Sequence, residues 1–183
     1  MNAFIKCSAL LFLLSSVAWA QVPSSVLLDR ACGPNNIKFK VYESSPPPLQ
    51  RDQLKSKAAI VIFPEEFADL TSCRMASRIG IDGKWVGAAC LGTYIRTKVD
   101  PGEHHLCANL RQKKNANFTA LYSFMAEAGK VYYFREEILD PWFGRNVTPI
   151  GGGKITVHLD PINEDEGRLL QSIRLTSESK VKK

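Results

Sequence analysis

The feature that most constrains the fold is a regular succession of short, strand-like segments. Between residues 37 and 160 such segments recur about every ten residues, and turn-forming residues separate them. Residues 37–43 (IKFKVYE) alternate apolar and charged side chains, which is the period of a half-buried strand. Residues 57–63 (KAAIVIF) are a continuous run rich in β-branched residues, which favours a buried strand. Together the segments predict an all-β fold, an antiparallel Greek-key β-sandwich of about eight strands.

One helix is predicted close to the C-terminus. Residues 163–173 (NEDEGRLLQSI) place acidic residues in the first turn, where the helix dipole favours them. Leu169, Leu170 and Ile173 are spaced as an apolar stripe, although Gly167 weakens the helix prediction. We therefore expect a β-sandwich that carries a single C-terminal helix.

The chain is expected to hold one domain, at residues 37–175. The proline-rich segment 44–56 is a connection within it, because consecutive prolines cannot donate to a strand ladder. Residues 21–36 look like an irregular lead-in. Residues 176–183 end in KVKK and predict a disordered basic tail.

The first 20 of the 183 residues predict a secretory signal peptide. Lys6 supplies the positive charge, a short apolar run follows, and Ala18-Trp19-Ala20 matches a signal-peptidase site. Cleavage is expected between Ala20 and Gln21. The expected product is periplasmic or extracellular, with no lipid anchor and no transmembrane segment in the mature chain.

The charge balance is mildly basic. The formal net charge of +6 falls to +5 when Lys6 is removed with the signal peptide. No basic face with interleaved aromatic residues is visible, so nucleic acid is not an expected partner. A weak attraction to anionic polymers of the cell envelope is compatible with this charge.

The cysteines predict disulfides. Four remain after cleavage, an even number that favours disulfide bonds in an exported chain, and no CxxC pair points to zinc or redox chemistry. Our first choice is Cys73–Cys107, which would join the strands flanking two predicted hairpins, and Cys32–Cys90 is a possible second bond. Cys73–Cys90 is the alternative, although a diagonal offset of two residues makes that bridge long.

Asp82-Gly83 predicts a two-residue hairpin turn, because both residues tolerate the positive φ of a type I′ turn. With that loop Ile79 would face Val86, and Met75 would face Cys90.

Pro101-Gly102 predicts a second hairpin. Proline presets φ at the first central position of a type II turn, and glycine takes the positive φ at the second. Val99 would then face His104.

The histidines do not predict a metal site, and we expect no cofactor. His104 and His105 are neighbours on a strand, so their side chains point to opposite faces. Asp82 and Glu103, at the tips of the two turns, were weighed as a catalytic carboxylate pair, but such residues are more often turn formers. Since no nucleophile has an activating partner in sequence, we expect no enzymatic activity.

Two tryptophans beside glycines, Trp85 and Trp142, are candidate platforms for stacking on sugars. The alternative is that each packs on the sandwich, which is the commoner role.

Several motifs in order resemble a known family. They are SRIGIDGKWVG, GTYIRTKVDPGEHHLCANL, FMAEAGKVYYFREEI and LDPINEDEGRLL, within residues 37–173. These resemble a family of bacterial exported domains of unknown function, similar in plan to PEGA-type sandwich modules with a prealbumin-like fold. The resemblance implies a β-sandwich in the cell envelope, and it implies no catalytic residues.

These observations favour a non-enzymatic binding or accessory module of the envelope. Its ligand would be cell-wall polysaccharide or a partner protein. The alternatives are a carboxylate-dependent hydrolase and a purely structural module. A sugar binder requires an outward aromatic platform, whereas a protein binder requires an exposed apolar patch or an unpaired edge strand.

Overall fold

The computed structural model describes residues 31–45, 54–65, 73, 75–111, 117–139 and 156–182. The predicted signal peptide with its cleavage site, and Trp142, lie outside the described residues. Within them, the secondary structure is β1 (Phe39–Ser44), β2 (Ala58–Pro64), β3 (Ala76–Ile81), β4 (Lys84–Cys90), β5 (Ile95–Val99), β6 (Gly102–Arg111), β7 (Asn117–Ala126), β8 (Val131–Leu139), β9 (Thr156–Ile162), α2 (Glu164–Ile173) and β10 (Thr176–Val181). No described helix is long and apolar enough to cross a membrane.

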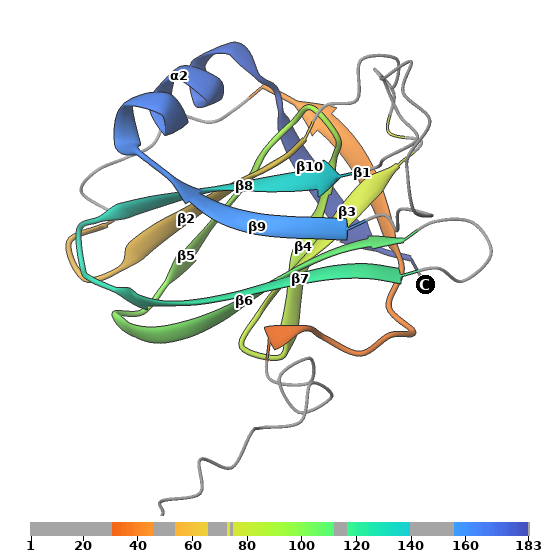
Figure 1. The fold of residues 1–183 in the computed structure, drawn as a ribbon, viewed down its shortest axis with the longest axis horizontal. Helices are drawn as coiled ribbons and strands as arrows, with labels where there is room; N and C mark the ends of the chain where they lie inside the picture. Colours follow the sequence, from red (N-terminus) through yellow and green to blue (C-terminus); the bar gives the residue numbers. More distant parts are fainter. Residues whose placement is uncertain are drawn as a thin grey trace, which may run out of the picture.

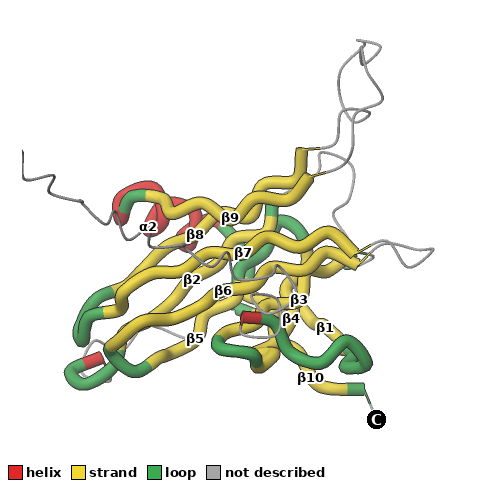
Figure 2. The backbone as a smooth tube through the Cα atoms, turned by 60° about the horizontal axis from the view of Figure 1, so that its bottom comes forward, coloured by secondary structure: helices red, strands yellow, loops and turns green. Residues whose placement is uncertain are grey.

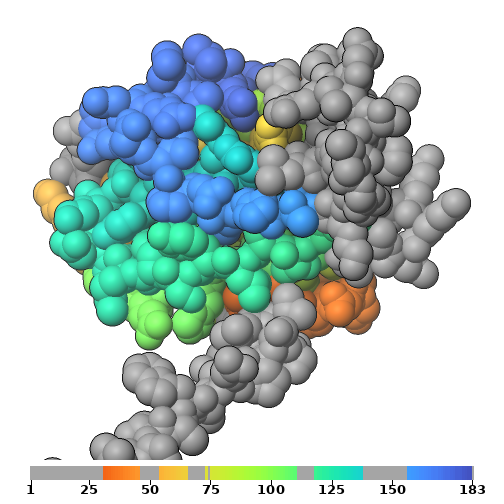
Figure 3. Space-filling model, in the orientation of Figure 1, coloured from red at the N-terminus to blue at the C-terminus, as the bar shows by residue number. Residues whose placement is uncertain are grey.

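The predicted all-β sandwich is confirmed. One four-stranded sheet has the order β5-β2-β8-β9, and a second has the order β4-β3-β6-β7 (Figure 1). The edge strands β7 and β9 lie side by side where the two sheets meet (Figures 1 and 3). The first sheet is mixed rather than purely antiparallel, because β2 and β8 run parallel. A parallel pair needs a long crossover, and here that crossover contains β5 and all four strands of the second sheet.

The main core lies between the sheets. Ile60, Ile62 and Phe134 of the first sheet are at most 1% exposed, and they belong to one cluster with Ile79 and Leu106 of the second. Every residue of β2 is buried, because its outer face is covered as well. This explains why residues 58–63 form an unbroken apolar run instead of alternating.

Helix α2 covers the outer face of the first sheet. Its N-cap is Asn163, whose side chain accepts a hydrogen bond from the Glu166 backbone N–H at 2.9 Å. A Cβ added to the buried Gly167 would lie 2.2 Å from Tyr133 Cγ. Glycine is therefore needed for the helix to approach the sheet this closely, which outweighs its poor helix propensity.

Only one of the three residues of the predicted apolar stripe packs against the sheet. Leu170 packs against the cluster that contains Tyr133, whereas Leu169 and Ile173 are 61% and 69% exposed. The stripe was inferred from spacing alone, and spacing does not determine which side of a helix meets the sheet.

The Asp82-Gly83 turn is confirmed, with φ of 51° and 76°. The predicted register beyond it is wrong, because the pairing shifts by one residue between Ile79 and Gly80. Ile79 therefore faces Gly87 instead of Val86, and Cys90 faces Ala76 instead of Met75. The extra residue is a β-bulge, which nothing in the alternating pattern indicated.

The predicted Pro101-Gly102 hairpin is wrong. Gly102 has the expected positive φ, 137°, but the turn joins two sheets: β5 pairs with β2, and β6 pairs with β3 and β7. Val99 consequently faces Ala58, and His104 faces Phe124. The turn residues specify a sharp bend, but the partner of each strand is decided by burial.

The structure contains the disulfides Cys32–Cys107 and Cys73–Cys90, with Cα–Cα distances of 5.2 and 4.9 Å. The first-choice pair Cys73–Cys107 and its companion Cys32–Cys90 are therefore wrong, and the alternative Cys73–Cys90 is present. Cys107 faces Gly80 across β6 and β3, and the missing side chain leaves room for the lead-in to lie on the sheet. Cys73 lies in a turn before β3 begins at Ala76, so the ladder spacing that argued against its bond to Cys90 does not apply.

The C-terminal segment is a strand rather than a disordered tail. β10 pairs with β1 over six residue pairs and forms a separate two-stranded ribbon (Figure 2). It also covers the edge of β4, because Ser179 and Ser177 accept hydrogen bonds from the backbone N–H groups of Ala88 and Cys90 at 3.0 and 2.9 Å. Serine hydroxyl groups thus accept hydrogen bonds from backbone N–H groups of an edge strand that would otherwise lack these partners.

Candidate functional site

A cluster of four lysines lies at one end of the β1–β10 ribbon. Lys40 faces Lys180 directly, and the Lys182 N–H donates to the Lys38 carbonyl at 2.9 Å, so Lys38 and Lys182 also face each other. All four side chains are exposed. Strand alternation places them on one face of the ribbon. We call this set the lysine face.

Few of the described carboxylates lie close enough to neutralise the positive charge of the lysine face. Among the described residues, no ion pair joins any of its four lysines to a carboxylate. Glu178 lies on the same face next to Lys180, but its carboxylate accepts from Ser44 Oγ at 3.0 Å. Lys40 Nζ lies 5.1 Å from the ring centre of Tyr42. Like charges directly opposite each other destabilise a ladder, so this arrangement costs stability.

An apolar groove lies beside β1, and two residues of the lysine face, Lys38 and Lys182, also border it. The groove has a volume of about 240 Å³. It is lined by Ile37, Lys38, Phe39, Val41, Ala76, Arg78, Ala88 and Lys182. Ala76 and Ala88 lie on β3 and β4, and their small side chains leave this space open beside β1.

β1 is also an edge strand. Its only ladder in the described part of the chain is with β10. Because the Lys38–Lys182 pair is hydrogen-bonded, alternation directs the N–H and C=O groups of Phe39, Val41 and Glu43 away from β10. No described strand pairs with these groups, so within the described residues they form an open edge beside the apolar groove.

Arg78 fixes the start of β1 against the second sheet. Its guanidinium donates to the carbonyls of Asn35 and Ile37 at 3.3 and 3.2 Å, and its Nε donates to Asn109 Oδ1 at 3.0 Å. Asn109 in turn donates to Thr119 Oγ1 at 2.7 Å. This buried arginine was not predicted from the sequence. The available signal was a charge inside the apolar run SRIGI.

Trp85 takes part in this packing and is not an outward platform. Its indole N–H donates to the Pro34 carbonyl at 2.8 Å, and the Arg78 guanidinium lies 4.4 Å from the ring centre. A Cβ on Gly33 would lie 2.4 Å from the ring, so the lead-in is in close contact with it. These contacts favour the packing interpretation of Trp85 over sugar stacking.

The two adjacent histidines point to opposite faces, as predicted. His104 is buried, and His105 hydrogen-bonds Ser123 Oγ at 2.8 Å. His104 Nδ1 lies 2.6 Å from an Asp82 carboxylate oxygen, and its Nε2 lies 2.7 Å from the Asp100 carbonyl. Both partners only accept, so the two contacts are satisfied together when the ring is protonated and donates from both nitrogens.

The electrostatic surroundings agree with a charged His104. Burial lowers the pKa of this imidazole, but the hydrogen bonds to Asp100 and Asp82, together with their charges, raise the pKa above its ordinary value. Asp82 also accepts from the His105 backbone N–H at 2.9 Å. Asp82 therefore holds the turn together and does not form the carboxylate pair with Glu103 that was considered.

Glu136 is a buried carboxyl group between the sheets. Ser77 Oγ donates to its Oε1 at 2.7 Å, and its Oε2 has no hydrogen-bond partner in the structure. Burial raises the pKa of Glu136 to about 7, and the nearby Glu65 charge adds to the rise. Neither Glu136 nor His104 lines the groove. The two perturbed groups therefore do not converge on this site as an acid–base pair would.

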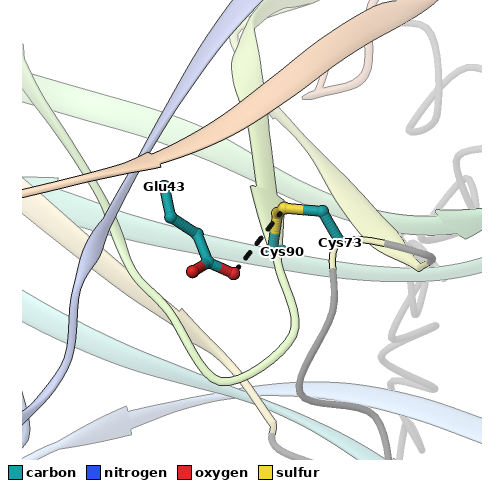
Figure 4. A group of neighbouring side chains, drawn as sticks. All are labelled: Glu43, Cys73 and Cys90. Carbon is teal, nitrogen blue, oxygen red and sulfur yellow. Dashed lines mark hydrogen bonds between the residues drawn. A yellow bond between two sulfur atoms is a disulfide. The ribbon is translucent and has the colours of Figure 1, made fainter.

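Glu43, Cys73 and Cys90 form the one candidate metal-binding cluster among the described residues (Figure 4). Their potential ligand atoms lie within 4.8 Å of one another, and Glu43 Oε1 is 3.9 Å from Cys73 Sγ. The two sulfurs are bonded to each other, so neither is the thiolate that binds a metal. Only the exposed carboxylate of Glu43 remains as a ligand.

No family model, no curated protein and no solved structure matches this chain. The resemblance to exported PEGA-like modules therefore stays a prediction.

Proposed function

We propose that the chain is an exported, non-enzymatic accessory module of the cell envelope that binds an acidic region of a partner protein through the β1–β10 ribbon. The observation that carries the proposal is the lysine face. Four exposed lysines oppose one another in two cross-strand pairs, and none has an acidic partner among the described residues. A ligand with negative charges would relieve this repulsion on binding.

Two features favour a protein over a polysaccharide as the ligand. Trp85 is occupied by Arg78 and Pro34, so it offers no free platform for a sugar ring. The groove beside β1 is lined mainly by apolar side chains, which suit the side chains of a polypeptide. The proposed export to the cell envelope rests on the signal-peptide pattern of residues 1–20.

Binding of defined polyanions tests the proposal. The mature protein is titrated into fluorescent poly-L-glutamate, with polygalacturonate as the acidic polysaccharide and dextran as the neutral one. The variant Lys40→Gln/Lys180→Gln removes one cross-strand pair. Lys84→Gln/Lys98→Gln removes the same charge from two exposed lysines outside the ribbon, and it is the matched control.

We expect poly-L-glutamate to bind in a salt-dependent manner and dextran not to bind. Loss of two ion pairs worth up to about 1 kcal/mol each should weaken binding about tenfold in the ribbon variant and little in the control. Equal losses in both variants would mean non-specific attraction and would overturn the proposal. Tighter binding of polygalacturonate than of poly-L-glutamate would assign the ribbon to a polysaccharide instead.

A further inference from the structure

We infer that the partner contributes an extended segment that adds to β1 as a third strand of the ribbon, with acidic and apolar side chains in alternation. The inference rests on the proposed function and specifies how the partner binds. Three independent features of the ribbon support it: its open edge, its two unlike faces and the groove beside it.

The open edge supplies the backbone contacts. The N–H and C=O groups of Phe39, Val41 and Glu43 point away from β10, and no described strand pairs with them. An extended segment that lies along this edge would form a regular ladder with these groups. Such strand addition gives affinity through the main chain and leaves specificity to the side chains.

The two faces of the ribbon determine which side chains the added strand must carry. Strand alternation directs Lys38 and Lys40 to one face and Phe39 and Val41 to the other. Phe39 and Val41 line the groove, which Lys38 also borders, whereas Lys40 does not. Side chains of an added strand would alternate between the same two faces. Those beside the lysines should be acidic, and those beside Phe39 and Val41 should be apolar.

The groove can receive the apolar side chains. Its volume of about 240 Å³ lies between β1 and the alanines at positions 76 and 88. A longer side chain at Ala76 would fill this space, whereas Lys40 and Lys180 do not line it, so the two contributions can be separated by mutation.

A second copy of this chain does not fit the same edge. If two β1 strands paired, Lys38 and Lys40 of each would lie on the same face of the joined sheet, and their like charges would repel. Lysines on an edge strand are a known protection against self-association. The occupant is therefore a different protein segment with the opposite charge.

A peptide of alternating glutamate and valine is the probe for this inference. Its affinity for the mature protein is compared with that of the same peptide N-methylated at alternate residues, on the edge that would meet β1. Val41→Pro removes one outward N–H that the β1–β10 ladder does not use, and Val41→Ala, which keeps the N–H, is its control. Ala76→Leu fills the groove. Circular dichroism and melting curves confirm that each variant is folded.

We expect N-methylation, Val41→Pro and Ala76→Leu each to weaken binding about tenfold, since each removes main-chain hydrogen bonds or the apolar contact. Val41→Ala should change the affinity much less. If the peptide binds and depends on Lys40 and Lys180, but N-methylation and Val41→Pro have no effect, strand addition is wrong and the proposed function stands. If neither this peptide nor poly-L-glutamate binds, the proposed function fails as well.

Discussion

Replacement of the buried Glu136 by glutamine should change how stability depends on pH. Glu136 is fully buried, with Oε2 lacking a partner, and its pKa rises from 4.5 to about 7 mainly because burial disfavours the charged form. Between these two values the native state keeps a proton that the unfolded state releases. The free energy of unfolding of the wild type therefore falls as pH rises through this interval.

The magnitude follows from the two pKa values. A rise from 4.5 to about 7 corresponds to about 3 kcal/mol, lost progressively between these pH values and fully lost above about pH 7. Glutamine cannot ionise and still accepts from Ser77 Oγ. The free-energy cost of burying the glutamine amide does not depend on pH, so it does not alter the pH dependence of the difference. Relative to the wild type, Glu136→Gln should therefore gain up to about 3 kcal/mol between about pH 4 and about pH 8.

Urea unfolding of both proteins across this pH range measures the difference. Glu137→Gln is the matched control, because Glu137 is the next residue of β8 and its side chain is 40% exposed. Its difference from the wild type should vary little with pH. A stability difference for Glu136→Gln that is constant from acid to alkaline pH would refute the argument that burial holds this carboxyl group neutral.

Three further substitutions test other contacts. Gly167→Ala should lower the free energy of unfolding by about 1 kcal/mol or more in urea titrations, because the overlap with Tyr133 outweighs the gain in helix propensity; a more stable variant would contradict this packing. Asp82→Asn should lower the pKa of His104 in an NMR titration, and the stability that the wild type gains from this contact should be present below about pH 6.5 and disappear as pH rises through the folded pKa; an unchanged His104 titration would count against the ion pair. Ser177→Ala should cost about 1–3 kcal/mol, because the buried amide of β4 that donates to this hydroxyl loses its acceptor; amide exchange at that position should accelerate, and an unchanged exchange rate would show that the amide has another acceptor.

Local sequence patterns were sufficient for the elements whose environment is itself local. The run at residues 57–63, rich in β-branched residues, predicted a buried strand, and the structure confirms it in β2. The Asp82-Gly83 turn was readable because positive φ is a property of the two residues themselves. Acidic residues after Asn163 also predicted the start of α2, because they interact favourably with the dipole of the helix that they begin.

Pairing between distant segments was not readable, because periodicity reports which face of an element is apolar and not which element covers it. The Pro101-Gly102 bend has the expected backbone, yet the strands on either side of it belong to different sheets. A one-residue β-bulge altered the register at Cys90, and the missing side chain of Gly80 admitted the lead-in that carries Cys32. The Cys32–Cys107 bond depends on the missing side chain of Gly80, and the Cys73–Cys90 bond depends on the place of Cys73 in a turn outside the β3 ladder.

The candidate site shows the same limit most clearly. Residues 176–183 are polar and basic, so by themselves they predict a solvated tail. Only the fold brings them against β1, where Ser44 and Glu178 make contact although they are 134 residues apart. That pairing sets Lys180 opposite Lys40 and leaves the other edge of β1 open. The lysines and the strand were present in the sequence, but the charged face exists only where β10 is held in place. Serine hydroxyl groups at the edge of β4 and hydrogen bonds to Tyr94 hold it there.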